Sequence, residues 1–314
     1  MATLFAELVS LAGNDLISCS DLSSIQVTAL LQLASELKAN VRHIELSGKV
    51  LGLIFSKAST RTRVSFSVAM ARLGGQTIDL LPLVTQVGRG EPIADTARVL
   101  SRYCDILAIR TFDQKELLDY ALWSTVPVIN ALTDLEHPCQ ALADYLTMQE
   151  AFGELEGLTM AYVGDGNNVA HSLMLCGALL GVNVRVGCPE GFSPHSDVLT
   201  QSVEMAAGRC SIEVVHTPLD AVRGAHALYT DVWASMGQEE EHLQRLQSFQ
   251  GWCLDESLLA MADPNAIVLH CLPAHRGEEI SAGIIESSAS RVFDQAENRL
   301  HVQQALMATL LNGL

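Results

Sequence analysis

The sequence has few basic residues, and this shortage limits what the chain can bind. Its 19 lysines and arginines are outnumbered by 36 acidic residues, which gives a formal net charge of -17. Because nucleic-acid binding rests mainly on Lys and Arg side chains that meet phosphates, this balance argues against a nucleic-acid partner. Twelve of the 19 bases nevertheless lie in residues 1–115, and none lies in residues 116–184. An anionic ligand is therefore expected to bind the first third of the chain, where the local field opposes the global charge.

The sequence also lacks the patterns that mark membrane, secreted and zinc-binding proteins. No apolar run reaches the roughly 18 residues that a membrane helix needs. The first basic residue is Lys38, so the start matches neither a secretory signal nor a transit peptide. The eight cysteines form no CxxC pair, and a chain of 314 residues needs no disulfide staples. We therefore predict a cytoplasmic protein with free thiols and no membrane partner.

Length and apolar patterning predict an α/β protein with two domains. A chain of 314 residues that is 49% hydrophobic can build two cores of ordinary size. Short apolar runs separated by helical patterns are typical of βα units, so each domain is expected to be a parallel sheet flanked by helices. The predicted strands include KVLGLIF, ILAIR and PVINAL before a short polar linker, and TMAYV, SIEVVH, HALYTDVW and AIVLHCLP after it.

The segment STRTRVSFSVAMARLGG is predicted to form a helix directly after the strand KVLGLIF. Ser and Thr at its start suit a helix N-cap, and the Gly-Gly pair suits its end. The apolar residues Val64, Val68 and Ala71 recur within it at helical spacing.

The start of this predicted helix is a candidate anion site. Lys57, Arg61 and Arg63 stand there among three hydroxyl residues. Backbone N–H groups and the positive dipole end of a helix attract an anion, and Arg offers paired donors that match phosphate oxygens. A capped helix with solvated arginines would explain the same residues, so the segment alone leaves both interpretations open.

Polar residues also follow other predicted strands, where ligands of parallel sheets bind. Arg110 ends ILAIR, and the HPCQ segment after PVIN supplies His137 and Gln140, which suit a carbonyl and a small amide. The segment GDGNN lacks the third glycine of a dinucleotide fingerprint, so we do not predict NAD. Asn167 and Asn168 are either N-caps or ligands for a carboxylate.

Two segments in the second half carry further candidates. In TDVWASMG, Asp231 and Ser235 are four residues apart and suit an ammonium group, although helix capping would explain them too. In HCLPAHRG, Cys271 stands close to His270 and His275, which suggests a nucleophilic Cys–His pair or a zinc site. Because no paired set of zinc ligands at recognisable spacing is present, no metal is predicted.

Taken together, these segments resemble the aspartate/ornithine transcarbamoylase family, and its ornithine branch in particular. STRTR and HPCQ mark the whole family, whereas DVWASMG and HCLP point to the ornithine branch. DTARVLSRY, GDGNN and FDQAENR extend the match over nearly the full chain. The resemblance implies a carbamoyltransferase of arginine biosynthesis that transfers the carbamoyl group of carbamoyl phosphate to the δ-amine of L-ornithine, with L-citrulline and phosphate as products.

The resemblance also implies how the chain is organised and assembled. A carbamoyl-phosphate domain is expected over residues 1–147, joined by a final helix at about 300–314 that returns to it. An ornithine domain is expected over residues 148–299. The protein is expected to need no cofactor and to be a homotrimer or a multiple of trimers, with active sites between subunits. The direction of flux in the cell is left open.

By the same resemblance, individual residues receive roles. The residues implied to bind carbamoyl phosphate are Ser59, Thr60, Arg61, Thr62, Arg110, His137, Gln140, Cys271, Leu272 and Arg299. The residues implied to bind ornithine are Asn168, Asp231, Ser235 and Met236. The residues implied to take part in catalysis are Arg110, His137, Asp231 and Cys271.

Other functions remain as alternatives. Putrescine or an acylated ornithine could replace ornithine as the acceptor, but Asp231 and Ser235 suit a free α-amino group that these compounds lack. A binding protein without activity could retain the same fold, but every expected catalytic residue type is present in the sequence.

Overall fold

The chain forms two parallel sheets, each flanked by helices, as the sequence predicts. The structure is a computed structural model that describes residues 2–57, 59–81, 90–234 and 242–314. It divides into one unit made of residues 1–142 and 297–314 and a second unit made of residues 143–296. Within the described residues, no helix combines the length and apolarity needed to cross a membrane.

The first unit is built on a four-stranded parallel sheet with the order β2-β1-β3-β4. Its strands are β1 (Val50–Phe55), β2 (Gln76–Leu80), β3 (Ile106–Arg110) and β4 (Val128–Leu132). Its helices are α1 (Ala2–Val9), the 3-10 helix η1 (Cys19–Asp21), α2 (Ser24–Lys38), α3 (Thr60–Arg72), α4 (Ile93–Leu100) and α5 (Gln114–Trp123).

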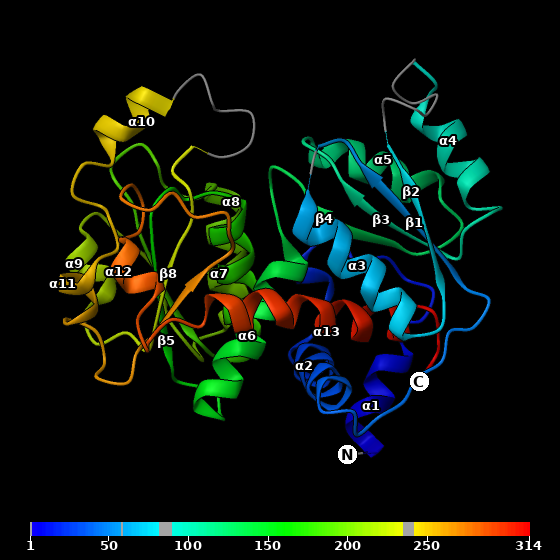
Figure 1. The fold of residues 1–314 in the computed structure, drawn as a ribbon, viewed down its shortest axis with the longest axis horizontal. Helices are drawn as coiled ribbons and strands as arrows, with labels where there is room; N and C mark the ends of the chain where they lie inside the picture. The colour runs from blue at the N-terminus through cyan, green and yellow to red at the C-terminus, as the bar shows by residue number, and fades with distance from the viewer. Residues whose placement is uncertain (1, 58, 82–89, 235–241) are drawn as a thin grey trace. The chain divides into compact units, whose positions relative to one another are not determined.

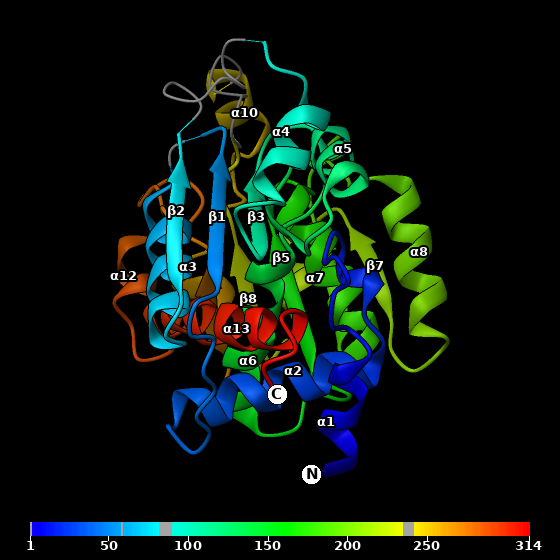
Figure 2. The same cartoon turned by 90° about the vertical axis from the view of Figure 1, so that its right-hand side faces the viewer.

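Helices cover both faces of this sheet, as the two views in Figures 1 and 2 show. Helices α4 and α5 pack on one face, where Ile54 and Ile109 of the sheet meet Ala97 and Tyr120 in one buried cluster. Helix α3 lies on the opposite face. Strand β1 therefore lies in a buried layer, and the turn that leads from it into α3 lies at the edge formed by the strand carboxyl ends.

The helix predicted after KVLGLIF is confirmed as α3. The apolar residues that indicated it, Val64, Val68 and Ala71, are nevertheless exposed. The buried side instead carries Thr62, Phe66 and Met70, which are spaced four residues apart. The larger Phe and Met side chains remove more apolar surface from water than valine does, and the polar Thr62 is buried because its hydroxyl is hydrogen-bonded.

Strand β2 has no counterpart among the predicted strands. It lies at the edge of the sheet and pairs only with β1 among the described strands. Its sequence QTIDL is largely polar and its side chains are exposed or half-buried. An edge strand does not need the apolar run that identifies a central strand of a parallel sheet.

The second unit is built on a five-stranded parallel sheet with the order β7-β6-β5-β8-β9. Its strands are β5 (Thr159–Val163), β6 (Asn183–Gly187), β7 (Ile212–Val215), β8 (Ala227–Thr230) and β9 (Ile267–His270). Its helices are α7 (Asn168–Leu180), α8 (Ser196–Ala206), α9 (Pro218–Val222), α10 (His242–Ser248), α11 (Glu256–Leu259) and α12 (Ala282–Ile285).

Two helices cross the boundary between the units. They are α6 (Pro138–Phe152) and α13 (Val292–Leu310). The boundary falls after Leu142 in the first and after Ala296 in the second. The domain boundary predicted after residue 147 lies in the same helix α6.

Helices also cover both faces of the second sheet, with α7 and α8 on one face and α9, α11 and α12 on the other (Figure 1). The second face holds a buried aromatic group in which Phe249 stacks on Trp233 and meets Trp252 edge-on. This core fixes the ends of β8 and β9, from which the polar segments of the unit emerge.

Each sheet has a point where the strand order reverses. In the first unit this point lies between β1 and β3, and in the second between β5 and β8. In open parallel sheets, ligands bind at the carboxyl ends of strands beside such a point. The two strand orders therefore predict that ligands bind at the segments after β1, β3, β5 and β8.

The cysteines are free thiols, as predicted. Five of the eight are buried, namely Cys19, Cys104, Cys139, Cys176 and Cys188. These five behave as small apolar core residues.

Candidate active site

The start of α3 follows β1 by a tight turn and forms the first part of the site. Ser59 occupies the N-cap position in an extended conformation, with φ of -153° and ψ of 103°. Within the described residues its side chain makes no capping hydrogen bond, unlike the usual Ser N-cap. Thr60, Arg61 and Thr62 form the first helical turn, and Arg61 is exposed. This turn presents the positive end of a 13-residue helix at the carboxyl end of β1.

Thr62 joins this turn to two arginines. Its hydroxyl oxygen accepts a hydrogen bond of 3.3 Å from Nη1 of Arg110 and one of 2.6 Å from Nη2 of Arg299. Arg110 pairs with Phe55 in the sheet register, so the ends of β3 and β1 lie side by side. Arg299 comes from α13, 237 positions away from Thr62 in the sequence. Two positive charges therefore meet on one fully buried hydroxyl.

His137 lies in the field of the same arginines. Burial lowers the pKa of His137 well below its usual value, and the positive charges of Arg299 and Arg110 lower it further. Its imidazole is consequently neutral at neutral pH and offers one donor and one acceptor. Gln140 is also buried, and its backbone N–H donates to the carbonyl oxygen of His137 at the start of α6.

The first unit thus brings together the predicted residues Thr62, Arg110, His137 and Arg299. Their arrangement combines two guanidinium groups, a neutral imidazole and a helix start. Such a set can hold a phosphate group and donate hydrogen bonds to a carbonyl oxygen.

The other two cations of the STRTR region have neighbours of their own. Lys57 lies over the ring of Phe112, 3.8 Å from its centre. Arg63 forms an ion pair with Asp79 of the edge strand β2 and lies over the ring of Phe55. Arg63 therefore stabilises the sheet edge, which sets it apart from Arg61.

In the second unit, Asn167 resolves the choice that the sequence left open. It is the N-cap of α7, since its Oδ1 accepts from the backbone N–H groups of Val169 and Ala170. Its Nδ2 donates to Oδ2 of Asp231 at 2.8 Å. Asn168 is the first residue of the helix. One side chain thus caps α7 and connects the ends of β5 and β8.

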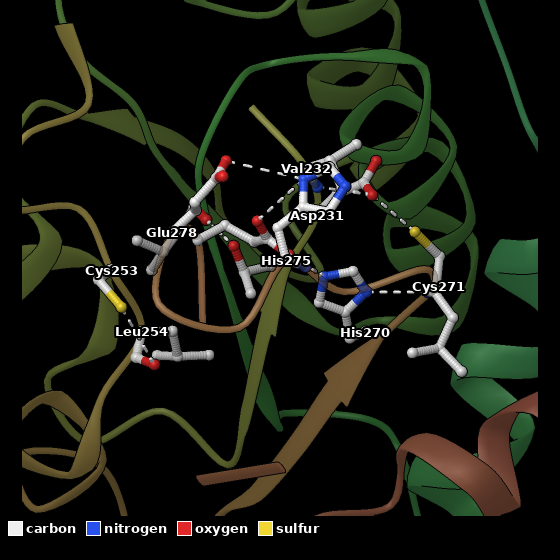
Figure 3. Close-up of polar contacts among 12 residues, drawn as sticks. Asp231, Val232, Cys253, Leu254, His270, Cys271, His275 and Glu278 are labelled. Carbon is white, nitrogen blue, oxygen red and sulfur yellow. Dashed lines mark hydrogen bonds and ion pairs between the residues drawn. The ribbon is translucent and has the colours of Figure 1, made fainter. Parts of the chain in front are cut away.

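Asp231 accepts hydrogen bonds from several neighbours in the second unit, two of which Figure 3 shows. Its Oδ1 accepts a hydrogen bond of 2.8 Å from Sγ of Cys271 and another of 2.8 Å from the backbone N–H of Val232. Its side chain is buried. The thiol of Cys271 is therefore a donor to a carboxylate, and this contact connects the end of β9 to the end of β8.

His270 does not form the Cys–His pair considered from the sequence. Its Nδ1 accepts a hydrogen bond of 2.8 Å from the backbone N–H of Leu272, and its Nε2 lies 3.0 Å from Oε1 of Glu279. Since Nδ1 accepts, the ring proton is on Nε2 and is donated to Glu279. Leu272 has φ of 58°, a backbone conformation that is rare for a residue with a branched side chain.

A metal ion fits poorly beside Cys271. Ligand atoms of Asp231, His270 and Cys271 lie within 4.8 Å of one another. Both ring nitrogens of His270, however, are already engaged by Leu272 and Glu279. An ion at this position would have to break one of these buried contacts.

Two predicted ornithine ligands, Ser235 and Met236, lie outside the described residues. The structure therefore adds nothing to their predicted role.

Some residues that support the site were not found from the sequence. Arg245 donates from Nη1 to Oδ2 of Asp165 at 2.7 Å and to the carbonyl oxygen of Trp233 at 2.8 Å, and it is buried. It thereby ties the loop after β5 to the segment after β8. Arg245 and Asp165 are 80 positions apart, and no sequence pattern relates them. Gln295 accepts from the backbone N–H of His270, and only its place in FDQAENR hinted at a role.

Comparison with known proteins identifies relatives over the full length of the chain. The sequence model for the aspartate/ornithine carbamoyltransferase carbamoyl-P binding domain matches residues 14–150, and the one for the Asp/Orn binding domain matches residues 156–310. The ornithine carbamoyltransferase of Prochlorococcus marinus strain MIT 9313 is 69% identical over 98% of this chain and 97% of its own length. That of Parasynechococcus marenigrum is 68% identical over 100% of this chain and 98% of its own length.

Solved structures show the same likeness. The ornithine carbamoyltransferase from Pyrococcus furiosus is similar with a TM-score of 0.93 and 48% identity, and the match covers 97% of this chain and 99% of that one. The crystal structure of ornithine carbamoyltransferase from Gloeobacter violaceus has a TM-score of 0.88 and 53% identity, over 96% of this chain and 99% of that one.

The lowered pKa of His137 predicts how its replacement changes stability with pH. Below the usual histidine value of 6.5 the unfolded chain binds a proton on this residue, whereas the folded chain does not. The contribution of His137 to stability is therefore lost as the pH falls below that value, at up to about 1.4 kcal/mol per pH unit. Urea unfolding of the wild type and of His137→Asn, measured from about pH 7.5 to about pH 5.5, should show the variant gaining relative stability on acidification. Parallel curves would contradict the neutral, buried imidazole.

Proposed function

Because this chain belongs to the aspartate/ornithine carbamoyltransferase family, we propose that it transfers the carbamoyl group of carbamoyl phosphate to the δ-amine of L-ornithine. The products are L-citrulline and phosphate. The observation that carries this proposal is the convergence of Arg110 and Arg299 on Thr62 at the carboxyl end of β1. The names of the relatives in both comparisons support ornithine as the acceptor.

The phosphate group is proposed to bind at the start of α3. Ser59, Thr60, Arg61 and Thr62 supply hydroxyls, backbone N–H groups and a guanidinium at the positive end of the helix. A dianion is held most strongly where several charge-assisted hydrogen bonds converge. The departing phosphate then leaves with its charge already matched.

The carbamoyl group is proposed to lie against Arg110, His137, Gln140 and Arg299. Arg110 and His137 donate hydrogen bonds to the carbonyl oxygen, which becomes an oxyanion in the tetrahedral intermediate. Loss of one such donor typically costs about 2.7 to 4 kcal/mol of transition-state stabilisation. Gln140, together with the backbone of Cys271 and Leu272, is proposed to read the carbamoyl amide.

Ornithine is proposed to bind through its α-amino and α-carboxylate groups to the second unit. Asp231 supplies a carboxylate for the ammonium group, and Asn168 supplies an amide, with Ser235 and Met236 completing the set. The contacts from Asn167 and Cys271 hold Asp231 in one orientation. A buried carboxylate that is held in one orientation suits the recognition of a cation.

The attacking amine must be uncharged. An alkylamine with a pKa near 10.4 is a free base in only roughly one molecule in 2,500 at pH 7. Arg61, Arg110 and Arg299 form a cationic set that favours the uncharged form of an amine brought to it. Asp231 and Cys271 are proposed to orient the amine for direct attack, so no covalent cysteine intermediate is required.

The wider setting is part of the same proposal and rests on the family resemblance. It includes a place in arginine biosynthesis, a cytoplasmic location, assembly as a homotrimer or a multiple of trimers, and activity without a cofactor. The carbamoyl-phosphate domain is proposed to be residues 1–147 with the final helix, and the ornithine domain residues 148–299.

The acceptor is tested by competition among amines. The protein is supplied with carbamoyl phosphate and a panel of ornithine, putrescine, acetylornithine and aspartate, and the products are identified by mass. Citrulline should be the dominant product, because Asp231 suits a free α-amino group. Carbamoylation of another acceptor in preference to ornithine would redirect the proposal, and no product at all would favour a binding protein without activity.

The phosphate site is tested by a pair of arginine variants. Arg61→Ala should reduce kcat/KM for carbamoyl phosphate by about 10- to 150-fold, because a hydrogen bond to a charged group contributes about 1.5 to 3 kcal/mol. Arg63→Ala is the matched control, since Arg63 is paired with Asp79. It should change kcat/KM little. Undiminished turnover in Arg61→Ala would remove the phosphate assignment.

The role of Cys271 is tested by Cys271→Ser. A serine hydroxyl can replace the thiol as donor to Oδ1 of Asp231, so kcat should fall by less than the roughly 100-fold that loss of an oxyanion donor costs. Mass spectrometry of the wild type during turnover should find no carbamoyl-thioester. A trapped thioester together with complete loss of activity in the variant would show that Cys271 is a nucleophile.

A further inference from the structure

The loop after β9 holds a second group of metal-binding residue types, away from Cys271. His275, Glu278 and Glu279 each direct one ligand atom into a region where these atoms lie within 4.8 Å of one another. Nδ1 of His275 is 3.7 Å from Oε2 of Glu278 and 3.9 Å from Oε2 of Glu279. Figure 3 shows the side chains of His275 and Glu278 turned toward each other. We propose that this group, the loop cluster, binds a divalent transition-metal ion.

The buried carboxylate of Glu279 is the observation that points to a ligand. Its side chain is completely buried. Oε1 accepts hydrogen bonds from the backbone N–H of His275 at 2.6 Å and from Nε2 of His270 at 3.0 Å. Oε2 is also buried, has no hydrogen-bond partner anywhere in the described ranges, and faces the ring of His275. A buried carboxylate oxygen left in this state is costly unless a cation or a donor satisfies it.

The histidine that is bonded to Glu279 does not cancel its charge. His270 accepts at Nδ1 from the N–H of Leu272, so its single ring proton is on Nε2 and the ring is neutral. Arg276, the arginine of the same loop, forms an ion pair with Glu286 instead. Neither His270 nor Arg276 therefore balances the negative charge of Glu279, and His275 does so only when its ring is protonated.

The surroundings of the loop cluster are negative. The pKa of Cys253 is raised to about 11, first by burial and then by the charges of Asp255, Glu279 and Glu256. Acidic side chains that disfavour an anion at Cys253 favour a cation near them, and Glu279 is one of these side chains.

The backbone holds the loop cluster in shape. The N–H of Glu278 donates to the carbonyl oxygen of His275 at 2.9 Å, and the N–H of Gly277 donates to that of Ile280 at 2.8 Å. The N–H of Leu254 donates to the carbonyl oxygen of Glu279 at 2.8 Å, which ties the loop to a neighbouring segment. His275 and the two glutamates are therefore brought to one side of a short, closed turn.

The ligand types and distances indicate which ion fits. One imidazole and two carboxylates suit Zn²⁺, Co²⁺ or Mn²⁺ better than Mg²⁺ or Ca²⁺, which prefer oxygen ligands alone. A tetrahedral ion with bonds near 2.0 to 2.2 Å separates its ligand atoms by about 3.4 Å. The observed 3.7 and 3.9 Å are slightly wider. The side chains of His275 and Glu278 are 48% and 34% exposed, so they are able to close on an ion, and water completes its coordination.

The ion would brace the loop that begins at Cys271, without taking part in the transfer reaction. None of the three ligands belongs to the residues proposed to bind substrate. An ion that binds the folded chain and not the unfolded chain also raises the stability of the folded chain by mass action. The sequence predicts no metal because it lacks paired ligands at recognisable spacing, whereas the three ligands of the loop cluster lie within one turn.

The experiment uses Co²⁺ as the probe and Cys271→Ser as the background, so that the thiol cannot contribute a ligand. Calorimetry should find one Co²⁺ per chain, and visible spectra should show nitrogen and oxygen coordination without a thiolate band. Adding His275→Ala or Glu278→Gln should weaken binding by at least about tenfold. Glu286→Gln is the matched control, since it removes an exposed carboxylate from the same region, and it should leave the affinity unchanged.

Thermal unfolding provides a second readout on the same proteins. Co²⁺ should raise the Tm of the Cys271→Ser background and of the Glu286→Gln control, but not that of the other two variants. Circular dichroism without metal verifies that each variant is folded. The proposal is overturned if the background binds no Co²⁺, if binding persists unchanged in His275→Ala and Glu278→Gln, or if Co²⁺ binds the wild type but not Cys271→Ser.

Discussion

The meeting of two guanidinium groups on the hydroxyl of Thr62 is the contact on which the first unit depends. Arg110 and Arg299 carry like charges, and bringing both to one buried oxygen concentrates positive charge at the carboxyl end of β1. Their field, added to burial, keeps His137 neutral. An anionic ligand at the start of α3 would relieve the repulsion between the arginines, because its charge is opposite to theirs. Positive charge is thus concentrated at the carboxyl end of β1, although the chain as a whole is acidic.

The second unit also has a parallel sheet, but it places a negative charge, the carboxylate of Asp231, at the end of a strand. Its reversal point lies between β5 and β8, and Asp231 follows β8. Asn167, Val232 and Cys271 all donate to the carboxylate of Asp231, so three different segments hold one anion in place. Carbamoyl phosphate carries negative charge and ornithine carries ammonium groups. The two sheets therefore offer binding sites whose charges are complementary to the two proposed substrates.

Much of the fold was predictable because buried parallel strands are short apolar runs. The runs around Val50–Phe55 and Ile106–Arg110 identified strands, and the polar residues that follow them identified the candidate site. The edge strand Gln76–Leu80 is not predicted from the sequence, because an exposed edge strand needs no apolar run. The buried face of α3 includes Thr62, a polar residue that no apolar pattern marks, and its hydrogen bonds explain why it is buried.

The sequence by itself determined the fold class, the family and the residue types at each strand end, because these depend on local periodicity and on motifs of a few residues. The tertiary structure decided which of these residues meet. It placed Arg299 against Thr62 and Cys271 against Asp231, and it gave both ring nitrogens of His270 to other partners. Such contacts join positions up to 237 residues apart, and strand order, helix packing and burial set their distances. Charge balance and hydrogen-bond partners follow from those distances, which no local pattern contains.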